Sequence, residues 1–169
     1  GGTRPRGTGG PGVTLLGTDE STGPLEHRVE VVTEAATDET PPLLRVTVTN
    51  GSDRSVRAGE ARALVFAYRD DTERHLTLLP ADETYPAEPG CWRLAEPIAV
   101  TEEYRRLTLA PGERTERTLA LYGAAGREAC LPVGSFRFET TYRVAPTTDD
   151  TPTEGERVER TWGFSVGLE

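Results

Sequence analysis

Residues 43–56 have the sequence LLRVTVTNGSDRSV, and this stretch decides the fold class. From Leu44 to Thr49, apolar and polar residues alternate, which is the period-2 pattern of a strand with one buried face. The pattern ends at Asn50-Gly51, a dipeptide typical of turns. Asn50-Gly51-Ser52 is also an acceptor sequence for N-glycosylation, a modification of exported proteins. The stretch therefore predicts a strand, a turn and a candidate glycosylation site at Asn50.

The same alternation recurs at short intervals along the chain, and no segment has a convincing helical period. We predict about eight or nine strands, drawn from residues 13–16, 27–35, 43–49, 62–68, 75–79, 91–100, 106–110, 115–122, 135–144 and 158–168. Loops are predicted at 37–42, 80–90 and 146–156, a tight turn at Pro111-Gly112 and a short helix at 101–106.

These segments favour an all-β fold, a two-sheet antiparallel sandwich that is Ig-like in the loose sense. A closed barrel is the alternative. We expect the strands at 27–35 and 43–49 to form a hairpin. The most apolar segment, 62–68, should lie in the middle of a sheet.

At 169 residues the chain is long enough to bury roughly 70% of its unfolded surface. Residues 1–24 are rich in Gly, Thr and Pro, and we interpret them as a flexible lead or tether that includes one short strand. Residues 25–169 are then the sandwich domain. Because residues 1–12 contain neither Met nor an apolar signal region, we expect a processed end.

Composition restricts the partners of this chain. All 19 basic residues are arginine, and the net charge is −9. Such an acidic, arginine-only composition indicates a GC-rich genome and suits concentrated salt, as in haloarchaea, with actinobacteria as the alternative. Nucleic-acid binding is not expected, because phosphate contacts need clustered basic residues. No apolar run reaches the roughly 20 residues that span a bilayer.

Cys91 and Cys130 are the only cysteines. Their spacing matches no zinc pattern, so a disulfide is the structural interpretation, in keeping with an extracellular or cell-surface location. A redox role is the alternative, although no C-x-x-C motif or basic cluster accompanies either thiol.

Three motifs occur in order along the chain. A strand ends in Asn50-Gly51-Ser52-Asp53, a Leu-x-Leu-x-Pro-Gly-Glu turn occupies 107–113, and a Gly-Ser-Phe-Arg-Phe strand occupies 134–138. This order resembles a broad group of secreted Ig-like modules that includes the intracellular proteinase inhibitor family of bacilli and many haloarchaeal lipoprotein-like domains of unknown function. The resemblance covers roughly residues 27–168 and transfers no catalytic or ligand-binding residue. Because a lipid-bearing cysteine precedes a Gly/Thr tether in such lipoproteins, it also implies a lipid anchor upstream of residue 1.

Few residues carry candidate chemistry. His27 and His75 are the only histidines, and His75 follows the acidic turn that contains Asp70-Asp71. A charged turn beside a strand is the favoured interpretation. Calcium binding at Asp70-Asp71 or Asp149-Asp150 is the alternative, although neither pair has the spacing of a calcium loop. We therefore predict no metal site, no cofactor and no catalytic residue.

Aromatic residues offer a second kind of site. Trp92 and Trp162 are expected in the core, whereas Tyr85, within the Pro-rich loop at 80–90, is the candidate partner-binding residue.

These features favour a non-enzymatic structural or interaction module at a cell surface. It would contact a protein partner, or a second copy of itself, through edge strands at 158–168 or 13–16. The alternative is a protease-inhibitor-like or ligand-binding sandwich that uses the 80–90 loop. An enzyme is the least favoured class.

Overall fold

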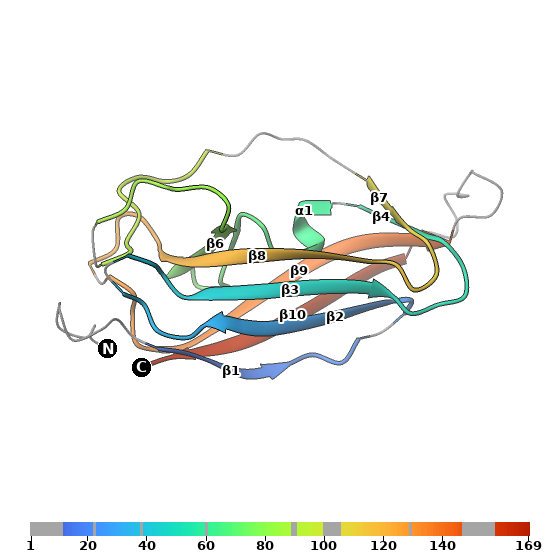
Figure 1. The fold of residues 1–169 in the computed structure, drawn as a ribbon, viewed down its shortest axis with the longest axis horizontal. Helices are drawn as coiled ribbons and strands as arrows, with labels where there is room; N and C mark the ends of the chain where they lie inside the picture. Colours follow the sequence, from blue (N-terminus) through green and yellow to red (C-terminus); the bar gives the residue numbers. More distant parts are fainter. Residues whose placement is uncertain are drawn as a thin grey trace.

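The computed structural model describes residues 12–21, 23–37, 39–59, 61–88, 91–99, 106–128, 130–146 and 158–169. Two five-stranded antiparallel sheets pack face to face around the main apolar core (Figure 1). The predicted all-β two-sheet sandwich is confirmed. No helix in the described ranges is long and apolar enough to cross a membrane.

Each sheet combines strands that are distant in sequence. The first sheet has the order β1 (Val13–Thr18), β10 (Val158–Leu168), β9 (Gly134–Pro146), β4 (Val56–Gly59) and β7 (Arg106–Leu109). The second has the order β2 (Leu25–Thr33), β3 (Leu43–Asn50), β8 (Arg114–Gly123), β6 (Leu76–Pro80) and β5 (Arg69–Asp70). The β2–β3 pair is the predicted hairpin. The short strand predicted within the N-terminal lead is present as β1, which pairs with β10.

Because apolar and polar residues alternate along the central strands, each buries one face in the core. In β3, Leu44, Val46 and Val48 are fully buried, and the residues between them are half-buried. On the inner face of the first sheet, the ring of Phe138 on β9 stacks on that of Phe164 on the neighbouring strand β10, with a centroid distance of 5.4 Å. Each such fully buried side chain stabilises the fold by roughly 1.5–3 kcal/mol.

The segment 62–68 is buried, as expected, but its predicted strand is wrong. Ala61–Leu64 forms the short helix α1, and a turn follows that links the first sheet to the second. Phe66 and Tyr68 have φ angles of 62° and 60°, which interrupt any extended backbone. A short, continuously apolar run does not distinguish a buried strand from a buried non-strand segment by its period.

The strand predicted at 91–100 is also wrong. Its described residues form a loop with isolated bridges from Arg93 to Gly123 and from Leu94 to Ala87. Trp92 has a φ angle of 61°, which prevents continuous pairing. The helix predicted at 101–106 lies outside the described residues except for Arg106, which begins β7. Of the predicted 146–156 loop only Pro146 is described, and it ends β9.

The two turns predicted at Asn50-Gly51 and Pro111-Gly112 connect different sheets. The second is a tight turn in which Glu113 N donates to Ala110 O at 2.9 Å and Gly112 has a φ angle of 76°. However, β7 before it belongs to the first sheet and β8 after it to the second, so the turn does not form a hairpin. Asn50-Gly51 lies at the corresponding crossing from β3 to β4.

The predicted edge strands differ in position. The segment 158–168 is β10, which pairs with β1 on one side and β9 on the other, so its prediction as an edge is wrong. Strand β1, which contains residues 13–16, is an edge of the first sheet.

The side chain of Asn50 joins the two crossings between sheets. Asn50 ends β3 and is fully buried. Its Nδ2 donates to Leu109 O at 2.9 Å and to Arg54 O at 2.7 Å, and its Oδ1 accepts from the backbone N–H and the hydroxyl of Ser52. Leu109 ends β7, so one of these bonds runs directly from the second sheet to the first.

His27 occupies an aromatic cluster between the sheets. Its ring stacks on Trp162 at a centroid distance of 4.7 Å, and its Nε2 donates to Leu64 O at 3.0 Å. Nδ1 is buried with no hydrogen-bond partner among the described residues. Burial, only partly offset by the bond to Leu64, lowers the pKa of His27 from 6.5 to about 4.

We expect Asn50→Asp to lower the free energy of unfolding by about 1–3 kcal/mol for each carbonyl that loses its donor. The substitution keeps the shape of the side chain but removes both Nδ2 protons and places a negative charge beside two carbonyl oxygens. Urea unfolding checks this, with Asp53→Asn at the neighbouring exposed position as the control. Equal unfolding midpoints for the two variants would contradict the role of Asn50.

We also expect stability to decrease as the pH falls from about 6.5 to about 4, by up to about 3 kcal/mol. The unfolded chain binds a proton at His27 in this range, whereas the folded chain excludes it, so acid favours unfolding. Denaturant unfolding at several pH values measures the effect. His27→Phe should remove this component and His75→Phe should retain it; the same pH profile in both variants would refute the assignment.

Candidate functional site

The outer face of the second sheet carries a separate apolar cluster. Ala120 and Tyr122 of β8 and Leu79 of β6 are buried there, together with Leu94 from the loop after β6. We name this loop, with its described residues 81–88 and 91–99, the covering loop. A sandwich needs only the inner faces of its sheets for its core, so the covering loop adds a layer that the fold itself does not require.

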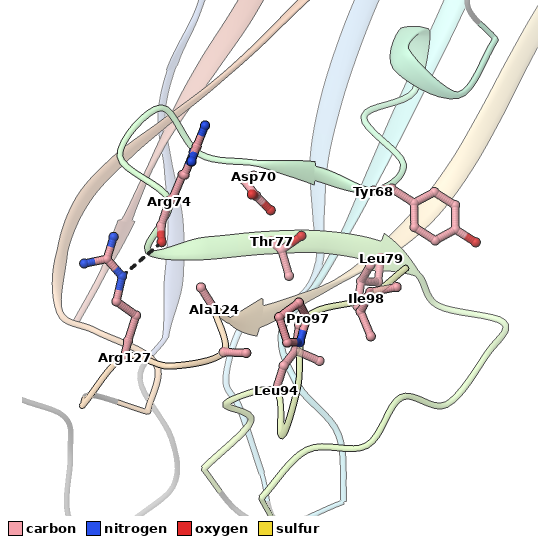
Figure 2. Close-up of a pocket in the computed structure, with 11 residues that line it drawn as sticks. Tyr68, Asp70, Arg74, Thr77, Leu79, Leu94, Pro97, Ile98, Ala124 and Arg127 are labelled. Carbon is pink, nitrogen blue, oxygen red and sulfur yellow. Dashed lines mark hydrogen bonds between the residues drawn. The ribbon is translucent and has the colours of Figure 1, made fainter. Parts of the chain in front are cut away.

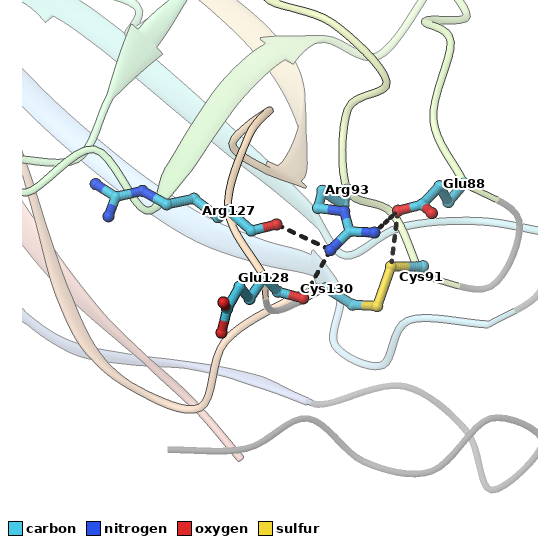
Figure 3. Close-up of a disulfide and its surroundings, with 6 residues drawn as sticks. All are labelled: Glu88, Cys91, Arg93, Arg127, Glu128 and Cys130. Atoms are coloured by element: carbon cyan, nitrogen blue, oxygen red, sulfur yellow. Dashed lines mark hydrogen bonds and ion pairs between the residues drawn. A yellow bond between two sulfur atoms is a disulfide. The ribbon is translucent and has the colours of Figure 1, made fainter.

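A disulfide joins the covering loop to the loop after β8 (Figure 3). Cys91 and Cys130 are bonded, which confirms the predicted pair. Beside it, Gly123 N donates to Trp92 O at 2.8 Å and Leu94 N donates to Gly123 O at 2.9 Å. A Cβ at position 123 would overlap the carbonyl oxygen of Cys130, so this close approach requires glycine.

Arg93 holds the same two loops together through its guanidinium group. It forms an ion pair with Glu88 and donates from Nη1 to Arg127 O at 2.8 Å and to Glu128 O at 2.6 Å (Figure 3). The Glu88 carboxylate also lies 3.6 Å from Cys91 Sγ. This is not a hydrogen bond, because the sulfur is in the disulfide and carries no proton. Covalent, ionic and backbone interactions therefore converge on Glu88 and on residues 91–94.

A pocket of about 500 Å³ opens between the covering loop, strands β5 and β6, and the loop after β8. Its apolar lining consists of Leu79, Leu94, Pro97, Ile98, Ala124 and Ala125. The volume lies within the range of small-molecule sites in proteins. Both loops that form its walls are the ones joined by the disulfide.

The polar lining consists of Tyr68, Asp70, Arg74, Thr77 and Arg127 (Figure 2). Arg127 donates from Nε to Arg74 O at 3.2 Å and from Nη2 to Glu73 O at 3.0 Å, which fixes its guanidinium group. Among the described residues, neither the carboxylate of Asp70 nor the guanidinium of Arg74 has an ion-pair or hydrogen-bond partner. The pocket thus carries charges of both signs beside an apolar wall.

Tyr85, the predicted partner-binding residue, lies in the covering loop but outside the pocket lining. Its ring packs edge-on against Tyr122 at 5.8 Å, and its hydroxyl donates to Glu83 Oε2 at 2.9 Å. Burial and the bond to Glu83 raise the pKa of its phenol. Tyr85 is therefore half-buried and helps to hold the covering loop on the sheet.

The predicted glycosylation of Asn50 stays a prediction, with a structural condition attached. Both Nδ2 protons are engaged and the side chain is 0% exposed. A glycan would replace one of these protons, so it would have to be attached before the chain folds and would break an inter-sheet or turn hydrogen bond.

The histidines and paired carboxylates have local roles. Asp71 is buried, and its Oδ1 accepts from the backbone N–H groups of His75 and Leu76 at 2.6 and 2.8 Å. Asp70 instead lines the pocket, of which Asp71 is not a lining residue (Figure 2). No group of three or more His, Cys, Asp or Glu side chains in the described ranges is arranged to hold a metal ion. Asp149-Asp150 lies outside those ranges.

The sequence interpretation missed Arg74, Thr77 and Arg127 as site residues. One signal was present: residues 76–80 are apolar or neutral without alternation, which indicates burial on both faces of the strand. A strand buried on both faces requires a covering segment, and the boundary of such a segment is where a pocket can form. The residues at that boundary come from distant parts of the chain.

We expect Cys91→Ser with Cys130→Ser to lower the free energy of unfolding by roughly 4 kcal/mol, because the disulfide closes a loop over a sequence separation of 39. Amide exchange at Leu94 and Gly123 should increase more than at Val46 of the core strand, since the covering loop opens locally. Hydrogen-exchange NMR measures both quantities. Uniform acceleration of all amides would contradict a local role of the disulfide.

Comparison with known proteins adds no assignment. No protein-family model matches the chain, and no curated protein and no solved structure is significantly similar to it. A function must therefore be argued from the chemistry of the site, because a β-sandwich alone supports many functions.

Proposed function

We propose that this chain is a non-enzymatic, extracellular or cell-surface β-sandwich that binds a ligand in the pocket beneath the covering loop. The observation that carries the proposal is the position of the disulfide. It joins the two loops that form the pocket walls, whereas the sandwich core is enclosed by the strands of the two sheets.

The proposed extracellular or cell-surface location is supported by the same disulfide. Disulfides persist in oxidising compartments and are rare in the cytosol. An extracellular domain also needs a rigid binding surface, because ordering a mobile loop on binding costs affinity. The interactions of Cys91, Arg93 and Trp92 hold the covering loop in one arrangement before any ligand arrives.

A second candidate function is assembly with another chain through the edge strand β1. Strand β1 is an edge of the first sheet, and Leu16 on it is 54% exposed. An edge strand with an exposed apolar residue can pair with a strand of another chain. It competes with the pocket as the functional surface.

The two candidates predict different outcomes. If the pocket is the site, we expect small organic fragments to shift the NMR signals of Thr77, Leu79 and Ala124, and the chain to be monomeric by light scattering. Ala124→Trp should fill the pocket and abolish the shifts, whereas Thr161→Trp, at an exposed position of β10, should not.

A concentration-dependent oligomer that Leu16→Arg converts to monomer would favour assembly instead. Fragment shifts that persist in Ala124→Trp would overturn the pocket as the site. The proposed location is tested separately by measuring the intact mass of the chain purified from its native cell. A fully reduced protein, without the Cys91–Cys130 disulfide, would contradict export.

A further inference from the structure

We propose that the pocket recognises ligands of the amino-acid class: a carboxylate next to an ammonium or amide N–H, beside an aliphatic side chain. The ligand is a free amino acid or the C-terminal residue of a peptide. This inference rests on the proposed function and specifies which ligand the pocket takes.

The apolar lining selects an aliphatic side chain. Leu79, Leu94, Pro97 and Ile98 lie together toward one end of the pocket, away from the arginines (Figure 2). Among the described residues of the lining, only Tyr68 is aromatic, and the guanidinium of Arg62 lies 5.6 Å from the centroid of its ring. Aliphatic groups of this kind stabilise a ligand by removing its apolar surface from water.

The arginine end selects a carboxylate. Arg127 donates hydrogen bonds from Nε and Nη2 to two backbone carbonyls, which fixes the plane of its guanidinium group. Its Nη1 remains available to a ligand. One of those carbonyls belongs to Arg74, whose backbone has a φ angle of 60°. The guanidinium of Arg74 itself has no ion-pair or hydrogen-bond partner among the described residues. Guanidinium groups bind carboxylates through paired, charge-assisted hydrogen bonds.

Asp70 selects a hydrogen-bond donor of the ligand, next to the ligand's carboxylate. It lies on β5 beside Thr77, with which it is paired in the sheet, and its carboxylate has no partner in the described part of the chain. Thr77 contributes a hydroxyl to the same wall. A ligand that carried two negative charges, such as a phosphate ester, would be repelled by Asp70, whereas a zwitterion satisfies both signs.

Three probes separate the parts of this recognition: L-leucine, N-acetyl-L-leucine and L-leucinamide, each titrated into the wild-type chain by ¹H–¹⁵N NMR. We expect leucinamide to bind at least about tenfold more weakly than leucine, because it lacks the carboxylate. If leucine binds more tightly than N-acetyl-leucine, the source is a free amino acid. If N-acetyl-leucine binds equally or better, the source is a peptide C-terminus.

Two variants assign the contacts. Arg74→Gln should weaken leucine and N-acetyl-leucine by about tenfold, whereas Asp70→Asn should weaken the two ligands that carry an ammonium group, leucine and leucinamide, more than N-acetyl-leucine. Arg28→Gln, an exposed arginine on β2, is the matched control and should leave all three affinities unchanged. Chemical shifts of residues outside the pocket report whether each variant keeps the fold.

The inference is overturned if none of the three probes shifts the pocket signals, or if neither Arg74→Gln nor Asp70→Asn changes the affinity. In either case the fragment and Ala124→Trp experiment still decides whether the pocket binds any ligand. Failure of the ligand class is thereby distinguishable from failure of the binding module.

Discussion

The hydrogen bond from Asn50 Nδ2 to Leu109 O is the interaction on which the sandwich depends. The chain crosses between sheets after β3 and again before β8, and both crossings meet at this side chain. The backbone of Asn50 adds bonds to the second crossing, from its N–H to Glu113 O and from Gly112 N–H to its carbonyl. Because a buried amide without partners would be costly, only the correct pairing of β3 with the β7–β8 turn satisfies all of these groups.

The pocket lies at the opposite end of the same framework. Strand β8 starts beside Asn50 and runs for 10 residues to Gly123, which separates the two regions by about 30 Å. At its far end β8 extends beyond β3, and the backbone of residues 92–94 takes the vacant hydrogen-bonding positions of Gly123. The disulfide and Arg93 then hold this addition in place. The covering loop is therefore a fixed addition to the sandwich, as is usual for binding loops that a rigid scaffold positions.

Some errors of the sequence interpretation share a cause. The predictions for segment 62–68 and for strand β10 rest on local sequence pattern, and that pattern correctly indicates that both contain buried residues. It does not report whether a buried apolar run continues as a strand, because Phe66 and Tyr68 adopt left-handed backbone angles that only packing between the sheets selects. It also does not report which neighbours a strand has, which is why the prediction of β10 as an edge strand fails: β10 pairs on both sides. The Pro-rich loop around Tyr85 predicts an exposed ring, yet Tyr85 packs onto Tyr122 of β8.

The all-β class, most strand positions, their buried faces and the pairing of Cys91 with Cys130 can be predicted from the sequence, since these follow from residue period, turn residues and the count of thiols. The burial of Asn50 as a link between the sheets, and the meeting of Asp70, Arg74 and Arg127 at one pocket, depend instead on how the whole chain packs. These residues lie on separate loops and strands, and their proximity depends on the order of strands in the second sheet. Strand order is set by the free energy of packing the whole chain, which no single segment contains.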